Sequence, residues 1–115
     1  MSKLTVEHAL VVRFSDTDAM GVVWHGNYLK FFEDGREAFG EKFNFRYLDM
    51  YNSGYFTPIV KSNIEHKAPI FYGDPVKVVA TLLISRAAKL VFEYQIVNTE
   101  TNVVCATGST TQVFL

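Results

Sequence analysis

The sequence predicts an α+β domain in which one long helix is covered by a mostly antiparallel sheet. Residues 28–43 show the three- and four-residue apolar spacing of an amphipathic helix. Most of the remaining chain has the alternation or the β-branched content of strands. The chain has 115 residues, of which 49% are hydrophobic. That length supplies one core, so residues 1–115 are expected to form a single domain.

The expected order is one strand, the helix and then four more strands. The first strand covers residues 6–14, and the loop that follows holds an apolar run, Val22 to Trp24, which suggests that it packs against something. Asn27 is the expected N-cap of the helix, and Gly35 is expected to let the helix approach a strand closely. No second helix is expected. The later strands are expected at 56–68, 75–86, 89–98 and 103–114, with turns at 72–75, 86–88 and 98–102.

Two features favour assembly of several copies. A single sheet around one helix leaves edge strands, and pairing with a second copy would cover one of them. The ten Phe and six Tyr residues also exceed what a small core needs, which favours an aromatic interface or an apolar pocket.

Composition argues against several classes of protein. The net charge of −1 gives no broad positive surface for nucleic acid or anionic membranes, and no apolar run is long enough for membrane insertion. Cys105 is the sole cysteine, so it forms no intramolecular disulfide, and it is expected in the core. The scattered histidines His8, His25 and His66 predict no metal site. No secretory leader is recognisable, so a cytoplasmic protein is expected.

The residues with the clearest chemical meaning are Asp16 and Asp18, just after the first expected strand. Residues two apart share a face in extended backbone, whereas a turning loop separates them. The spacing therefore leaves open whether they form a carboxylate pair, bind a metal or cap a turn. At least one is expected to accept hydrogen bonds from loop amides.

The residues after this pair lead directly into the helix. Gly21 permits a sharp turn, Val22 to Trp24 offer an apolar wall, and His25 precedes the helix start. Free amides at a helix N-terminus stabilise negative charge, including the oxyanion that forms when a thioester carbonyl is attacked. A carboxylate opposite these amides could activate water or attack the carbonyl directly. The segment is therefore consistent with acyl transfer to water.

The segment D-T-D-A-M-G-V-V-W-H-G-N-Y-L, residues 16–29, resembles the signature of the 4-hydroxybenzoyl-CoA thioesterase family, which includes acyl-CoA thioesterases of the Tol–Pal gene cluster. Two further segments resemble that family, T-P-I-V at 57–60 and F-Y-G-D at 71–74. The resemblance covers essentially the whole chain in the same order. It implies the hot-dog fold, a homodimer or homotetramer, and active sites formed between subunits.

The resemblance also implies roles for individual residues. Asp18 matches the catalytic carboxylate, and the amide of His25 matches the group that polarises the thioester; in some members the His side chain is thought to assist. Arg86 and Lys89 fall in the turn where members hold the CoA phosphates, although Ala87 and Ala88 make this turn less basic. The residues expected to bind substrate are Gly21, Val22, Val23, Trp24, Thr57, Arg86 and Lys89. No cofactor is expected, since coenzyme A is part of the acyl-CoA substrate.

Some positions depart from the family, and alternatives remain. Phe14 stands where some members have Tyr, so that hydroxyl is absent. The chain ends at Leu115, without the short tail by which members could contact CoA or each other. Glu33 and Glu37 are reserve carboxylates, because other hot-dog thioesterases place theirs on the helix. A hot-dog dehydratase is disfavoured, since its D-x-N-P-x-H pattern is absent. A thioesterase for acyl-carrier-protein thioesters and a non-catalytic acyl-CoA-binding module remain alternatives.

Overall fold

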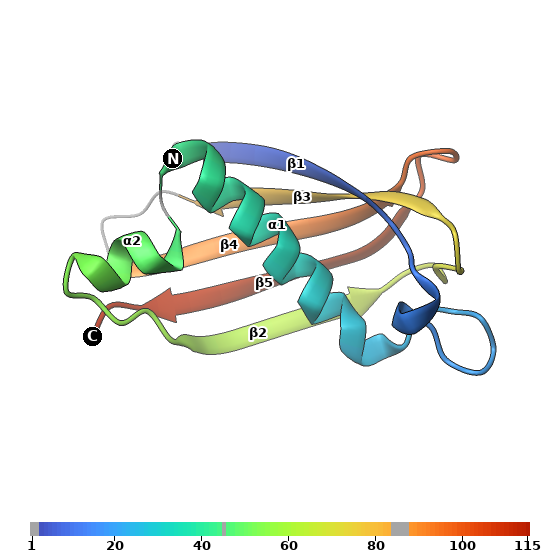
Figure 1. The fold of residues 1–115 in the computed structure, drawn as a ribbon, viewed down its shortest axis with the longest axis horizontal. Coiled ribbons are helices and arrows are strands. Elements are labelled where there is room, and N and C mark those ends of the chain that lie inside the picture. Colours follow the sequence, from blue (N-terminus) through green and yellow to red (C-terminus); the bar gives the residue numbers. More distant parts are fainter. Residues whose placement is uncertain (1–2, 45, 84–87) are drawn as a thin grey trace.

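The computed structural model describes residues 3–44, 46–83 and 88–115. Its long helix and its strands follow the expected order, and a short second helix is added (Figure 1). The strands are β1 (Lys3–Val11), β2 (Ile59–His66), β3 (Pro75–Leu83), β4 (Lys89–Asn98) and β5 (Val104–Val113). The helices are α1 (Tyr28–Phe43) and α2 (Tyr47–Asn52), with 3-10 turns at Phe14–Asp16 and His25–Asn27.

The strands form one antiparallel sheet in the order β1-β3-β4-β5-β2. Tyr94 of the central strand β4 is paired with Ala80 of β3 and with Gly108 of β5. The predicted α+β arrangement is therefore confirmed. β1 and β2 are the two edge strands, and most of β2 is exposed.

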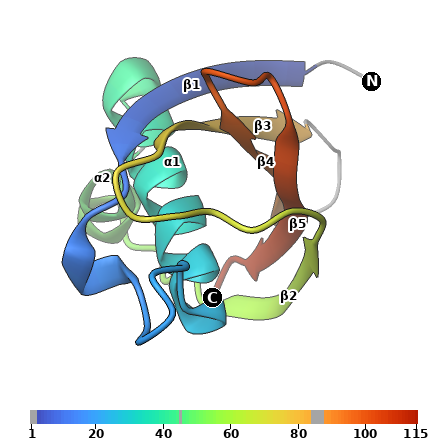
Figure 2. The ribbon, with the colours of Figure 1, turned by 90° about the vertical axis from the view of Figure 1, so that its right-hand side faces the viewer.

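The sheet curves around α1, which lies along its inner face (Figure 2). The apolar positions of the helix face this sheet: Phe32 stacks on Tyr94 with ring centroids 4.6 Å apart, and Phe39 meets Phe92 edge-on at 5.1 Å. A Cβ built on Gly35 would lie 2.6 Å from Cγ1 of Val78 on β3. Gly35 therefore permits the close helix–sheet approach that the sequence predicted.

The local boundaries differ from the prediction in several places. β1 ends at Val11, because the chain turns where the Asp16 carboxylate accepts the Arg13 amide at 2.9 Å. The unpredicted helix α2 is only six residues long, too short for a periodic signal, and its start is stabilised by Asp49, which accepts the Arg46 amide at 2.8 Å. The strand expected at 56–68 is observed at Ile59–His66, and the one expected at 103–114 at Val104–Val113.

The two ends of the molecule carry different features along its longest dimension of 43 Å. At one end, to the right in Figure 1, lie the loop of residues 12–24 and the start of α1. We call this the Asp18 end. At the other end, to the left, lie α2, the segment 53–58 and the C-terminus. We call this the α2 end, and the edge strand β2 runs from it toward the Asp18 end.

Candidate active site

Asp16 is the buried member of the carboxylate pair, with 2% of its surface exposed. One oxygen accepts the Arg13 amide at 2.9 Å and the other accepts Nζ of Lys30 at 3.2 Å. Its main-chain oxygen accepts the Trp24 amide at 3.1 Å and Nδ2 of Asn27 at 2.8 Å. Asp16 therefore connects the end of β1, the segment before α1 and the first turn of α1.

Asp18 is exposed, and its hydrogen bonds to other described residues are confined to its own turn. Oδ1 accepts the Met20 amide at 2.8 Å, while the Asp18 amide donates to the Val22 carbonyl at 2.9 Å. Gly21, which has φ of +78°, closes the turn. The two carboxylates therefore have separate partners: Asp16 is a structural group, and Asp18 keeps an oxygen available to solvent.

The amide of His25 lies at the entry to α1. Residues His25–Asn27 form a 3-10 turn, and the Tyr28 amide donates to the His25 carbonyl. Within the described residues, the His25 amide donates to no acceptor. Asn27 lies at the N-cap position of α1, as predicted, but its side chain makes no capping hydrogen bond and Nδ2 donates to the Asp16 carbonyl instead. Its backbone is already helical, with φ −85° and ψ −10°, whereas a capping residue is normally extended. The helix start thus offers an unpaired amide close in sequence to the Asp18 turn.

The apolar run before His25 is split between core and surface. Val23 is buried and its amide donates to the Ile70 carbonyl at 2.7 Å, whereas Val22 is half-buried and bridges to Phe71. Trp24, expected to bind substrate, is 50% exposed and lies over Gly26, where any Cβ would collide with the indole ring. The Trp24 ring is therefore available to a ligand beside the His25 amide.

Large apolar side chains surround Asp18 at the surface. Phe14 and Tyr72 meet edge-on with ring centroids 5.7 Å apart, and the Tyr72 amide donates to the Gly21 carbonyl at 3.0 Å. In the loop 12–24 and at residues 71–72, the large apolar side chains that are about half or more exposed are Phe14, Met20, Trp24, Phe71 and Tyr72. Such a patch around a carboxylate is typical of an interaction or substrate surface.

Tyr28 and His66 connect the Asp18 end with the edge strand. Their rings are 4.5 Å apart, with His66 at the last position of β2 and Tyr28 at the first of α1. Tyr28 is buried, and this burial raises the pKa of its phenol above its ordinary value. Nothing in the spacing of His66 along the sequence connects it with Tyr28, so this contact was not predicted.

The other predicted substrate residues lie away from Asp18 within one chain. Thr57 is buried at the α2 end, where its main-chain oxygen accepts Nε2 of Gln112 at 2.6 Å. Its hydroxyl and Oε1 of Gln112 are both buried, and neither has a hydrogen-bond partner among the described residues. Lys89 is exposed at the start of β4. Arg86 lies outside the described residues. Asp18, His25 and residues 21–24 therefore lie in one short segment of the chain, whereas Thr57 and Lys89 belong to other elements.

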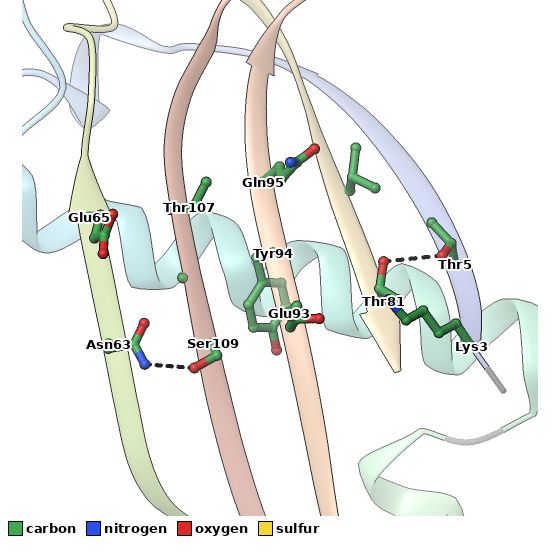
Figure 3. A pocket seen from close by; sticks show the side chains of 12 residues that line it. Lys3, Thr5, Asn63, Glu65, Thr81, Glu93, Tyr94, Gln95, Thr107 and Ser109 are labelled. Carbon is green, nitrogen blue, oxygen red and sulfur yellow. Dashed lines mark hydrogen bonds between the residues drawn. The ribbon is translucent and has the colours of Figure 1, made fainter. Parts of the chain in front are cut away.

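Two hollows in the described surface lie elsewhere. One, of about 550 Å³, is on the face of the sheet away from α1 (Figure 3). Its side chains are mostly polar and include Thr5, Thr81, Gln95, Thr107 and Ser109. The other, of about 20 Å³, lies between α1, α2 and the sheet and is lined in part by Gln112. Neither includes Asp18 or His25, so chemistry rather than concavity identifies the site.

Two further features of the described residues bear on function. No group of three or more His, Cys, Asp or Glu side chains among them could hold a metal ion. Across the same residues, no helix is both long and apolar enough to cross a membrane.

Cys105 is buried, as expected for a core residue, and burial raises the pKa of its thiol.

Comparison with known proteins identifies a family. Residues 12–115 match the thioesterase-like superfamily. The Bacillus subtilis protein YneP is 39% identical over 87 residues, which are 76% of this chain and 63% of YneP. The acyl-CoA thioester hydrolase YbgC of Escherichia coli is 30% identical over 89 residues, 77% of this chain and 66% of YbgC. The chain thus spans slightly under two thirds of the length of these relatives.

Solved structures give the same result for the fold. A DHNA-CoA thioesterase from Staphylococcus aureus is 33% identical, with a TM-score of 0.87 over 96% of this chain and 74% of the other. The 1,4-dihydroxy-2-naphthoyl-CoA thioesterase Slr0204 from Synechocystis has a TM-score of 0.90 over 96% of this chain and 82% of the other, at 24% identity. The expected hot-dog fold is confirmed.

Proposed function

The chain belongs to the thioesterase-like superfamily, and from this premise we propose that it hydrolyses acyl-CoA thioesters to a free acid and coenzyme A. The observation that carries the proposal is that the two aspartates of the D-x-D pair lie in different environments. Asp16 is buried and fully occupied by structural contacts, whereas Asp18, two residues later, is exposed in a turn that leads to the unpaired His25 amide. A water-accessible carboxylate and a free helix-start amide are the two groups that thioester hydrolysis needs.

In the proposed reaction, the carbonyl oxygen of the thioester accepts a hydrogen bond from the His25 amide. Asp18 takes a proton from water as the water oxygen attacks the carbonyl carbon, and the amide stabilises the oxyanion that forms. The C–S bond then breaks, and the sulfur of coenzyme A leaves and takes up a proton. Alternatively, Asp18 attacks the carbonyl itself, and water hydrolyses the resulting anhydride. The α1 dipole favours the oxyanion in both routes.

The site is completed by a second copy of the chain in this proposal. β2 is an edge strand, and Ile59 and Val60 are 39% and 59% exposed. Antiparallel pairing of two β2 strands about a two-fold axis brings the residues before β2 of one copy beside the end of β2 of the other. That end is next to Tyr28, since His66 stacks on it. Exposed Tyr55 and Phe56, next to Thr57, then form the second wall of the acyl cleft.

The assembly is tested by the mass of the protein in solution. Sedimentation should give at least twice the chain mass of 13.1 kDa. Val60→Lys introduces a charge at the proposed strand interface and should shift the protein toward the single-chain mass and lower activity together. A monomeric wild type with full activity would contradict the composite site.

The catalytic proposal is tested by Asp18→Asn. The Asn side chain keeps an oxygen for the Met20 amide, so the turn is preserved while the basic charge is lost. CoA release, followed with a thiol reagent, should fall by about 10²–10⁴-fold. Glu37→Gln is the matched control, because Glu37 is an exposed helix carboxylate and the reserve candidate; its rate should stay near that of the wild type. Equal rates for wild type and Asp18→Asn would remove Asp18 from the mechanism.

The same assay separates the alternatives. A panel of short, long, branched and aromatic acyl-CoAs, with matching acyl-carrier-protein thioesters, would report which carrier and acyl group are turned over. Saturable binding of acyl-CoA without thiol release would instead support a non-catalytic binding module. The proposed hydrolase and a non-catalytic module would both bind acyl-CoA. Release of free thiol is therefore the measurement that decides between them.

A further inference from the structure

We propose that Asp16 and Lys30 act as a positioning pair that fixes the Asp18 turn relative to the His25 amide and thereby sets the rate of the chemical step. The inference rests on the proposed function, because it assigns the buried half of the D-x-D pair a part in the reaction carried out by the exposed half. It concerns residues that never touch the substrate, and it predicts that a half-exposed lysine on the helix controls turnover.

The first observation is that a charged group is buried where burial is costly. The side chain of Asp16 is 3% exposed, and the Lys30 ammonium 3.2 Å away is its cationic partner within hydrogen-bonding distance. Arg13 approaches only to 3.9 Å with Nε, and its side chain is 71% exposed. Buried ion pairs contribute little net stability compared with apolar residues of similar size. Their best supported benefit is to specify one arrangement of the chain, which here is the arrangement of the loop.

The second observation is that Asp16 joins the elements that carry the two reacting groups. Its carboxylate holds the Arg13 amide, its main-chain oxygen holds the Trp24 amide, and Asp18 follows two residues later. Trp24 immediately precedes His25. Lys30 lies in the first turn of α1 and Asn27 just before it, so both bind Asp16 from the helix side. Movement of Asp16 would therefore change the gap between the Asp18 carboxylate and the His25 amide.

The third observation is that Lys30 places a positive charge in the first turn of α1, where the helix dipole disfavours it. Acidic residues are favourable in the first turn of a helix and cations are not, yet the first turn of α1 has no acidic residue and contains Lys30. A carboxylate there would compete with the thioester oxyanion for the helix amides. Lys30 instead supplies the counter-charge for Asp16 and leaves the helix amides free for substrate.

The test uses Lys30→Met, which keeps the aliphatic stem of a half-exposed side chain and removes its charge, with Lys30→Arg as the conservative replacement. The control is Lys42→Met, because Lys42 is an exposed lysine in the last turn of the same helix. Lys30→Met should lower kcat about tenfold or more with KM little changed, since a displacement of about 1 Å at a reacting group can cost 10²-fold. Lys30→Arg should recover most of the rate, and Lys42→Met should match the wild type.

A double-mutant cycle with Asp16→Asn tests the pairing itself. If the two residues act as one unit, the double variant should lose about as much kcat as the worse single variant. Additive losses, or unchanged kcat in Lys30→Met, would overturn the proposal. A fall in thermal stability with kcat per folded molecule unchanged would also overturn it and leave a merely structural ion pair.

Hydrogen exchange provides a readout that does not need turnover. The Arg13 and Trp24 amides are both bonded to Asp16, so Lys30→Met should make them exchange about tenfold faster or more. Unchanged exchange would overturn the positioning role even in an active enzyme. A wild type that releases no CoA would instead defeat the proposed function, and the exchange result would still decide whether Lys30 holds the loop.

Discussion

The Asp18 end and the α2 end are held together by different kinds of contact. At the Asp18 end, a buried carboxylate with charged and amide partners fixes the loop, and the Asp18 carboxylate accepts the Met20 amide within its turn. The α2 end also has hydrogen bonds, such as that from the Arg46 amide to Asp49, but aromatic side chains contact one another there, as Tyr51 meets Phe56 at 5.4 Å, and among the described residues two buried polar atoms of this end have no partner. Directional hydrogen bonds fix a geometry, whereas apolar contacts tolerate rearrangement. The difference is consistent with the proposed reaction at the Asp18 end and with the proposed contact with a second copy at the α2 end.

Among the changes that compare the two ends, the largest effect is expected at the Asp18 end, from Gly26→Ala. A Cβ there would collide with the Trp24 ring and displace it beside the His25 amide. We expect kcat/KM for acyl-CoA hydrolysis to fall about 10²-fold with thermal stability nearly unchanged, because the displaced ring would shift a thioester bound at the His25 amide, and a small misplacement of a reacting group costs that much. In a Trp24→Ala background the same change should have little further effect. A tenth or more of wild-type activity in the single variant would show that this end tolerates displacement as well.

An intermediate effect is expected at the α2 end, from Phe56→Ser. Phe56 is 55% exposed in one chain and is proposed to cover the acyl group bound to a second copy. Losing its apolar area should raise KM about tenfold while kcat changes little, because burying a Phe side chain contributes about 1.5–3 kcal/mol. Val103→Ser removes a similarly exposed side chain, at 46%, beyond the 98–102 loop and serves as the control. A fall in kcat alone would contradict the distinction between the ends.

The smallest effect is expected from a pair of isosteric changes. The Thr57 hydroxyl is buried without a partner, whereas the Thr110 hydroxyl is 2.8 Å from that of Tyr94. Thr110→Val should therefore lower the free energy of unfolding by about 1 kcal/mol, while Thr57→Val should leave it unchanged or raise it by a similar amount. Chemical denaturation of both variants gives the comparison. Equal destabilisation would mean that the Thr57 hydroxyl has a partner in the assembled protein.

Much of the secondary structure was predictable because its causes are local. The spacing of Phe31, Phe32 and Phe39 predicted α1 with the bounds that the structure shows, and the period-two alternation did the same for β4. The turn at 72–75 was also correct, since Gly73 has φ of +84° and Asp74 accepts the Phe71 amide at 2.8 Å. α2 was missed because six residues give too few turns for a period to be recognised.

The candidate site was only partly predictable. The motif that resembles the thioesterase family directed attention to Asp18 and His25, and their catalytic roles remain predictions. Asn27 was placed correctly at the start of α1, but its side chain makes no capping hydrogen bond, because its backbone is already helical; its side-chain amide donates to a carbonyl eleven residues away. Lys30 gave no signal at all: its partner Asp16 is fourteen residues away, and only folding brings the two together.

By itself, the sequence determined the class of the fold, the position of the long helix and the segment that resembles the thioesterase family, because periodicity, turn residues and a contiguous motif act over short distances. Only the tertiary structure decided which of the two aspartates is buried and which amide at the helix start is free. It also decided that Thr57 lies at the α2 end of the molecule, away from Asp18. Burial and electrostatic pairing depend on residues that are distant in sequence and adjacent in space. Two carboxylates separated by a single threonine can therefore have different environments and different tasks.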